Sequence, residues 1–571
     1  MAPPKVSGND SSSPSGVLSK WSVGVQLLNR SSRASHLLLA LLLLATAGLL
    51  LALTAELTFY QDTWAILMHR QSWALSSFME PHNEHIVVLP TLIEKSLVTV
   101  FGMRSARPEL VLMVAMVILT VALVYRFMIR RVSASIAIAS AAILAFLGPG
   151  WPILLWPFQI AFLGSLSLGI CALLALERCG RRGDLLACAA LGGALAFSSV
   201  GLSFISGAAI ALFLRREKTW KQIWILLVPL VLFGAWYLGW GHAAESHVSI
   251  RNALNAGPYV LEALASSAEV AVGLASTPIN APAPPAIWGK AIVVAGLAAV
   301  VWRLQGGRPR PSSKIWITLA ILLSFWTLAA LNYIPGREPS VDRYAFIGVV
   351  LLFLFLSDLF AGIRVSPAAT AVVVLIAGMA VGSNLVKLHD ARQYLAEQTA
   401  LTRADTAAME IARRTIPESF ALTPEIAGTP SLIDINAPEY FRAIDSYGSP
   451  AYSAEELFNA PDAGRRQADI VLAHALPIGV SAATSNSGPN ERECSRTASN
   501  EAKLPFGDLT IAIPPGPSVQ LSLRRFAPRG VFPVKLEAAP GGSIVHLSIP
   551  EDFATRHWRL GLGAGQAVGI C

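Results

Sequence analysis

Two groups of ionisable residues follow the first apolar run of this chain, and their side chains suit chemistry on a hydroxyl or amine group. The first is Asp62, in the stretch 59–64. The second is a cluster with two carboxylates and two imidazoles, Glu80, Pro81, His82, Asn83, Glu84 and His85. A carboxylate can deprotonate a hydroxyl when the two oxygens lie about 3 Å apart. We therefore expect Asp62 to be the first candidate for a catalytic base and Glu84 the second. The alternative for Asp62 is a carboxylate that ends a helix at the membrane surface.

The cluster at 80–85 admits three interpretations. On a helix, Glu80 and Glu84 would share one face, and His82 and His85 would be neighbours three positions apart. We favour recognition of a substrate sugar with acid–base support. The alternatives are a divalent metal site and helix capping, but the spacing is not a recognised zinc pattern such as HExxH, so we expect no metal and no cofactor. The candidates for substrate binding are Glu80, His82, Asn83, His85 and, further along, Lys95.

A third candidate group lies at residues 337–344, immediately before the tenth apolar run. An arginine can hold a phosphate through charge-assisted, bidentate hydrogen bonds. We expect Arg343, Arg337 and Tyr344 to bind the phosphate of a donor molecule. The alternative for Arg343 is an interfacial anchor whose charged end reaches the lipid head groups. Arg70 is a weaker candidate for the same role.

The composition places these residues in a polytopic α-helical membrane protein. Hydrophobic residues form 54% of the 571 residues, the mean hydropathy is +0.54, and the apolar residues gather in runs long enough to cross a bilayer as helices. The net charge of +8 does not indicate nucleic-acid binding, because Lys and Arg lie largely in short loops between the runs. The sequence predicts about eleven spans, near 36–56, 108–127, 132–148, 156–176, 184–198, 200–214, 221–240, 286–304, 314–333, 344–361 and 367–386.

Basic residues predict the orientation of these spans. Clusters precede the first span and follow the second, fourth, sixth and eighth, at 126–131, 178–182, 215–221 and 303–314. Cytoplasmic loops of membrane proteins carry an excess of Lys and Arg. The pattern predicts a cytoplasmic N-terminus and, with eleven spans, an extracytoplasmic C-terminal region. The groups at 59–64, 80–85 and 337–344 then share the outer face.

Three domains are expected. Residues 1–35 are rich in Ser, Gly and Pro and are typical of a disordered cytoplasmic tail. Residues 36–388 form the transmembrane domain, and 389–571 an extracytoplasmic α+β domain. In the latter, 389–415 has helical composition and 485–503 is expected to be a loop. From about 509, short alternating apolar runs between Pro- and Gly-containing turns predict a β-sandwich.

Together these features resemble GT-C-type membrane glycosyltransferases over roughly residues 36–390. The resemblance rests on Asp62 after the first span, a long first outer loop with amphipathic stretches, the pair Arg343 and Tyr344, and the large C-terminal domain. The stretch 81–85, with the apolar segment that ends at 101–102, is similar to a subset of bacterial members. Gln61 precedes Asp62, so the paired acidic residues of the metal-dependent members are missing here, and the resemblance is to the members that need no metal.

The resemblance implies an inverting transfer of a sugar from a polyprenyl-phosphate donor to an envelope glycan or lipid acceptor. It places the chain in a bacterial plasma membrane, in contact with membrane lipid. Two other functional classes remain as alternatives, a secondary transporter and a non-catalytic scaffold for polysaccharide assembly. A secondary transporter would place ionisable residues near the middle of the membrane, whereas here the interiors of the runs are nearly free of charge.

Cys494 and Cys571 both lie in the expected extracytoplasmic domain, where oxidising conditions favour disulfides. We predict that they are bridged; the alternative is two free thiols. The bridge would close a loop of roughly 75 residues and stabilise the domain by about 4 kcal/mol. Mass spectrometry of non-reduced peptides should find the linked pair, and alkylation of both thiols in fresh protein would reject the bridge.

Overall fold

The computed structural model describes residues 32–178, 180–215, 219–275, 278–279, 284–305, 312–432, 435–476, 478–483, 495–497, 501–513, 519–529, 532–536, 543–553, 556–562 and 568–570. The chain divides into two compact units. Unit 1 comprises residues 1–55, 74–92 and 110–392, and unit 2 comprises 56–73, 93–109 and 393–571. The segment expected to be the first outer loop is therefore divided between the units, with Asp62 in unit 2 and the cluster at 80–85 in unit 1.

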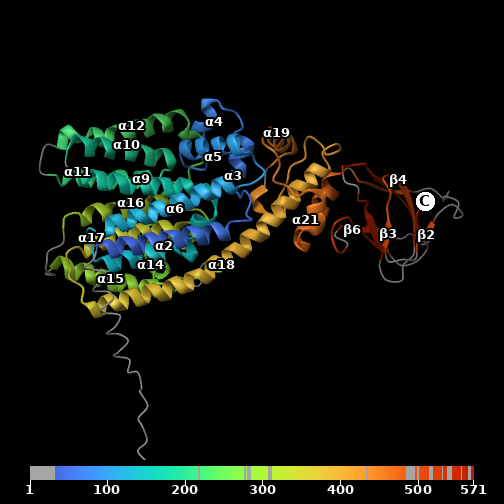
Figure 1. Ribbon diagram of the computed structural model, residues 1–571. Helices are drawn as coiled ribbons and strands as arrows, with labels where there is room; N and C mark the ends of the chain where they lie inside the picture. The colour runs from blue at the N-terminus through green and yellow to red at the C-terminus, as the bar shows by residue number, and fades with distance from the viewer. Residues whose placement is uncertain are drawn as a thin grey trace, which may run out of the picture. The chain divides into compact units, whose positions relative to one another are not determined.

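Unit 1 is a bundle of apolar helices that lie side by side (Figure 1). Each expected span coincides with a helix: α2 (Ser32–Leu53), α6 (Arg107–Met128), α7 (Ala134–Ala145), α9 (Ile160–Leu176), α10 (Arg181–Phe197), α11 (Gly201–Phe213), α12 (Trp224–Gly239), α15 (Ile287–Gln305), α16 (Ile315–Leu331), α17 (Asp342–Leu359) and α18 (Pro367–Ile411). Long apolar runs form helices because a helix satisfies its own backbone hydrogen bonds where water is absent.

Four helical segments in the described residues are long and apolar enough to cross a membrane by themselves, namely Ser32–Leu53, Arg107–Met128, Pro157–Leu176 and Pro367–Ile411. A fifth is added if α7 and the stretch Gly148–Leu155, which meet at 52°, form one broken span. Other expected spans are shorter as helices, with 13 residues in α11 and 16 in α12. The chain thus has the apolar helices of a membrane protein, and the number of about eleven spans stays a prediction.

The third expected outer loop contains more structure than a loop. Its apolar stretch forms α14 (Ala256–Ala271), which packs against α15, α16 and α17 inside the bundle. The helix begins after the short α13 (Ile250–Leu254), whose first turn is capped by the Ser249 hydroxyl. Near its other end, the buried Glu269 accepts a hydrogen bond from the backbone N–H of Gly289 at 3.0 Å. Part of the expected outer loop therefore belongs to the helical core.

The helical part of unit 2 is built around the end of α18, with α3 (Asp62–His69), α19 (Ala437–Tyr447), α20 (Ala454–Asn459) and α21 (Asp462–Ala475). Trp64 is fully buried and donates from its indole to the Phe59 carbonyl at 3.0 Å. The Tyr440 hydroxyl, also buried, donates to Glu410 at 2.6 Å. A helix of 45 residues is about 68 Å long, so α18 continues well past a single membrane crossing, as the helical composition of 389–415 predicted.

Two antiparallel sheets complete unit 2. One has the order β1-β7-β4-β9-β2 and the other β3-β8-β5-β6. The strands are β1 (Gly479–Ala483), β2 (Ser495–Thr497), β3 (Glu501–Lys503), β4 (Gly507–Ile513), β5 (Val519–Arg524), β6 (Phe532–Leu536), β7 (Ser543–Ile549), β8 (Arg559–Leu562) and β9 (Val568–Ile570). The predicted C-terminal β structure is confirmed, but it begins at 479 rather than 509. The prediction that 485–503 is only a loop was wrong, because two three-residue strands in it pair with β9 and β8.

Buried polar contacts join the helices of unit 2 to its sheets. The Asp469 carboxylate, on α21, accepts hydrogen bonds from the backbone N–H groups of Arg525, Phe526 and Ala527 at 2.8–3.1 Å. The Arg525 guanidinium forms a two-pronged pair with Asp552, and neither side chain is exposed. Buried polar groups are costly when unpaired, so this arrangement fixes how β5 ends against α21.

We predict that Arg525→Met strongly destabilises unit 2, because it leaves the Asp552 carboxylate buried without its cation. Loss of one partner of a buried ion pair costs about 3–5 kcal/mol. Thermal unfolding and trypsin sensitivity of the full chain measure the effect. The double variant Arg525→Met/Asp552→Leu should recover much of the loss, and a single variant as stable as the wild type would contradict this assignment.

Candidate functional site

The cluster at 80–85 forms a tight hairpin in unit 1. The backbone N–H of His82 donates to the His85 carbonyl, and the N–H of His85 donates to the His82 carbonyl, both at 3.0 Å. Asn83, between them, has φ +50°, a conformation that Asn adopts more readily than most residues. The helical arrangement considered for Glu80 and Glu84 was therefore wrong. Glu80 ends the preceding helix α4 (Leu75–Met79), and α5 (Val88–Phe101) begins after the hairpin.

The two histidines of the hairpin pack against neighbouring aromatic rings. The His82 ring meets Phe158 edge to face with centroids 5.1 Å apart, and the His85 ring meets Phe162 in the same way at 6.0 Å. Phe162 lies in the first turns of α9. The aromatic contacts hold the hairpin against α9 and against the short helix Pro157–Gln159 that precedes it.

Glu84 forms an ion pair with Arg337, which lies 253 positions later in the chain. Both side chains are largely buried, with 21% and 14% of their surfaces exposed. Arg337 belongs to a tight turn in which Gly336 has φ +88° and the Arg337 N–H donates to the Ile334 carbonyl at 2.9 Å. The Tyr259 hydroxyl of α14 donates to the Arg337 carbonyl at 2.9 Å. The pair thus ties the hairpin to a turn that the bundle holds in place.

The start of α17 brings the other expected phosphate-binding residues to the same turn. Arg343 donates to the Gly336 carbonyl at 2.8 Å, and its guanidinium carbon lies 5.4 Å from the centre of the Tyr344 ring. Tyr344 packs edge to face on Trp326, with centroids 5.8 Å apart. The preceding Asp342 accepts a hydrogen bond from the Trp151 indole at 2.7 Å. Arg337, Arg343 and Tyr344 are therefore gathered in one place, as the sequence predicted, although Arg337 faces a carboxylate.

A cavity of about 300 Å³ lies beside these residues, entirely within unit 1. Glu84, His85, Ser199, Ser203, Asn332 and Glu245 supply polar groups to its wall. Most of the remaining lining is aromatic or aliphatic, and includes Phe162, Phe233, Trp236, Tyr237, Phe325 and Tyr344. The Trp236 indole donates to the Met79 carbonyl at 2.7 Å, which anchors α12 near the hairpin. The cavity therefore offers an apolar wall with a carboxylate and an imidazole at one side.

The charges at this cavity favour an ionised carboxylate next to a neutral imidazole. Burial alone would raise the pKa of Glu84, but the charges around it, including that of Arg337, hold its pKa below the ordinary value. Burial lowers the pKa of His85, against the opposing effect of Glu84. At neutral pH, Glu84 can accept a hydrogen bond from a hydroxyl group, and the uncharged His85 can donate or accept one.

Asp62 and Lys95 lie in unit 2. Asp62 begins α3, after Gln61 with φ +43°. Beside it, the hydroxyls of Tyr60 and Tyr394 are 3.1 Å apart, and burial, Tyr394 and the Asp62 charge together raise the pKa of Tyr60. Lys95 donates to the Ser72 carbonyl and lies 5.0 Å from the centre of the Trp73 ring. The roles of Asp62 and Lys95 stay predictions, as do those of the other candidates.

From the sequence we also expect no metal site and a disulfide bridge between Cys494 and Cys571. Within the described ranges, no group of three or more His, Cys, Asp and Glu side chains could hold a metal ion. Cys494 and Cys571 both lie outside the described residues, so their pairing also stays a prediction.

Several cavity residues were not found from the sequence. Ser199 lies in the turn between α10 and α11, Ser203 in the first turn of α11, and Asn332 at the end of α16. The signal for all three is a polar residue at the expected outer end of an apolar run. That signal is weak, because polar residues often end apolar helices without lining a site.

Comparisons with known proteins leave the family undecided. No protein-family profile matches the chain, and no curated protein matches it. Among solved structures, it is similar to the cryo-EM structure of arabinosyltransferase EmbB from Mycobacterium smegmatis, with 14% identity and a TM-score of 0.29 over 92% of this chain. The chain spans 64% of the length of that structure. A likeness of this size decides neither fold nor activity.

We predict that Arg337→Met lowers the stability of the protein by about 1–3 kcal/mol, less than for a fully buried pair because both partners keep some exposure. The pKa of Glu84 is depressed in the folded state, so the pair contributes fully at neutral pH and its contribution is lost as the pH falls through that pKa. The difference in melting temperature between wild type and Arg337→Met should therefore shrink on acidification.

The matched control is Glu245→Gln, since Glu245 lines the same cavity but is 86% exposed. This variant should melt like the wild type over the same pH range. A difference between wild type and Arg337→Met that stays constant or grows as the pH falls would contradict the assignment of the ion pair.

Proposed function

We propose that this chain is a membrane glycosyltransferase that transfers a sugar from a polyprenyl-phosphate donor to a cell-envelope glycan or lipid acceptor. The proposal places it in the plasma membrane of a bacterium, with about eleven spans and the reaction on the outer face. One observation supports it above the others: an aromatic cavity in an apolar bundle has Glu84 and His85 on its wall, with Arg337 in the adjoining turn and Arg343 at the start of α17.

The cavity suits a ligand that is part sugar and part lipid phosphate. Its volume of about 300 Å³ is at the lower end of the range for small-molecule sites. Aromatic side chains can pack on the apolar faces of a sugar ring, while Glu84, Asn332 and the serine hydroxyls can bond its hydroxyl groups. Arg343 donates to a backbone carbonyl and has further N–H groups with which to bind a phosphate.

The transfer we propose is a displacement with inversion. The acceptor oxygen forms a bond to the anomeric carbon, the bond from that carbon to the phosphate oxygen breaks, and the electron pair leaves with the polyprenyl phosphate. The acceptor proton passes to a carboxylate. Arg343 stabilises the negative charge that develops on the phosphate. The proposal gives no role to a metal ion.

Two carboxylates compete for the role of base. Asp62 is the first choice from the sequence, because it directly follows the first span. Glu84 gains support from its place on the cavity wall, but its ion pair with Arg337 also suits a residue that orients the acceptor or the sugar. We propose Asp62 as the base that removes the proton, with Glu84 as the second candidate.

We predict that Asp62→Asn folds, binds donor and is nearly inactive, because loss of a general base typically slows a reaction about 100- to 10,000-fold. Glu84→Gln should lose less. Release of polyprenyl phosphate from a labelled lipid-linked sugar, by purified protein with an acceptor extract, measures both.

An active Asp62→Asn with an inactive Glu84→Gln would assign the base to Glu84. If neither variant affects turnover, neither Asp62 nor Glu84 is the base. If no lipid-linked sugar is consumed, the glycosyltransferase proposal fails and a transporter or a scaffold gains support.

We predict that Arg343→Ala weakens donor binding and lowers turnover, and that Arg343→Lys restores little, because a lysine cannot form the bidentate contact. Arg251→Ala is a control from an exposed position on α13. Normal donor binding by both Arg343 variants would leave Arg343 as an interfacial anchor.

A further inference from the structure

A second cavity, of about 250 Å³, lies at the opposite ends of the helices that form the first one. The first cavity is lined by the beginnings of α9, α11 and α17 and the end of α16, while the second is lined by the ends of α9, α11 and α17 and the beginning of α16. These helices have 13–18 residues, which corresponds to lengths of about 20–27 Å. The separation of the two cavities along these helices therefore approaches the thickness of the hydrocarbon core of a bilayer, about 30 Å.

The polar side of the second cavity is a network of charged side chains. Glu177 forms ion pairs with three cations, with N–O distances of 2.8 Å to Arg130, 2.7 Å to Arg131 and 2.9 Å to Lys314. Arg131 also pairs with Asp358 at 2.5 Å, and Arg215 pairs with Asp184 at 2.8 Å. Among the described residues, these ion pairs join four cations to three carboxylates, which leaves one positive charge. Lys314 keeps 49% of its side chain exposed, so it can donate to a further anion.

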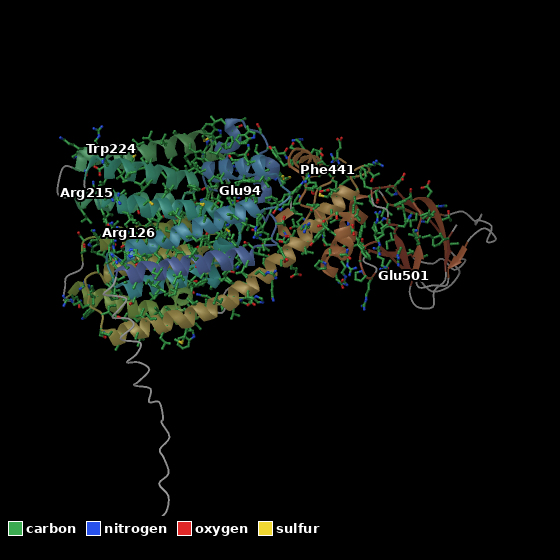
Figure 2. All side chains as sticks on the ribbon, in the orientation of Figure 1. Glu94, Arg126, Arg215, Trp224, Phe441 and Glu501 are labelled. Atoms are coloured by element: carbon green, nitrogen blue, oxygen red, sulfur yellow. The ribbon has the colours of Figure 1, made fainter. Side chains whose placement is uncertain are left out.

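The other walls of this cavity are apolar. They are formed by Phe127, Leu173, Leu176, Ala211, Leu214 and Ile317, which belong to α6, α9, α11, α16 and the residue after α11. Arg126 and Arg215 lie at one end of the bundle, where Trp224 begins α12 (Figure 2). Basic residues and Trp gather at the level where hydrocarbon meets water. The cavity thus has apolar walls towards the membrane interior and cations at the surface level.

We infer that this second cavity binds an anionic phospholipid of the expected cytoplasmic leaflet, with the phosphate against Lys314, beside Arg131, and the start of an acyl chain against the apolar walls. The residual positive charge favours a lipid with net negative charge over a zwitterionic one. A small soluble anion would satisfy the cations but leave the apolar walls without a partner, so the shape favours a lipid.

The test uses the purified full-length protein in detergent, titrated with phosphatidylglycerol, phosphatidylcholine or inorganic phosphate while the melting temperature is recorded. A ligand that binds the folded state raises the melting temperature with its concentration. We expect a saturable rise with phosphatidylglycerol and little change with the other two. An equal rise with phosphatidylcholine, or with inorganic phosphate, would overturn the inference.

Two kinds of variant distinguish lipid binding in this cavity from a general attraction of anionic lipid to surface charge. Lys314→Ala should weaken the apparent affinity for phosphatidylglycerol about fivefold, and Lys314→Glu more, as expected for loss and reversal of one cation near an anionic lipid. Ala211→Phe keeps every charge but fills the apolar part of the cavity, and should abolish saturable binding. Melting in phosphatidylcholine alone checks that each variant folds.

The matched control is Lys290→Glu. Lys290 is similarly exposed, at 54%, and also forms a 2.8 Å pair with a glutamate, Glu262, but it does not line the second cavity. It should bind phosphatidylglycerol like the wild type. If Lys314→Glu and Ala211→Phe both bind with wild-type affinity, or if Lys290→Glu weakens binding as much as Lys314→Glu does, the lipid does not occupy this cavity.

Discussion

The ion pair between Glu84 and Arg337 is the contact on which the candidate site depends. It joins a hairpin near the beginning of the chain to a turn more than 250 positions later. Neither residue could be buried to this extent alone, because a buried charge needs a partner. Burial would raise the pKa of Glu84, and the charge of Arg337 helps to hold that pKa below the ordinary value. The backbone around Arg337 is held by Tyr259 and by the turn at Gly336. The same turn accepts the hydrogen bond that orients Arg343.

The helices of unit 1 separate two kinds of polar structure by about the thickness of a membrane core. At one end, few charges surround a cavity with aromatic walls. At the other, cations and carboxylates neutralise one another around Glu177. Burial alone would raise the pKa of Glu177, but these cations hold its pKa below the ordinary value. The apolar helices form the bundle, and the polar and charged side chains that they position lie at their ends. This division favours an enzyme of the membrane surface over a transporter, which would place ionisable groups near the middle of the membrane.

Local patterns in the sequence predicted many of the helices and strands, but they could not predict which residues from distant segments form contacts. The apolar runs predicted the positions of the helices, and alternation predicted the C-terminal sheets. The hairpin at 80–85 was missed because its spacing also fits a helix, and the left-handed conformation of Asn83 leaves no strong trace in the sequence. The grouping of Arg337, Arg343 and Tyr344 follows from their closeness in sequence, whereas the pairing of Arg337 with Glu84 depends on packing between distant segments. Strands β2 and β3 escaped notice because three residues are too few to show alternation.

The central claim is that a lipid-linked sugar occupies the cavity beside Glu84 and Tyr344. A cryo-EM map of the full-length protein with a non-hydrolysable polyprenyl-phosphate sugar tests it most directly. The account predicts density for the sugar in this cavity, within hydrogen-bonding distance of Glu84 or Asn332, and density for the phosphate next to Arg343. Density for the bound donor at a different place, with the Glu84 cavity empty in the same map, would contradict it.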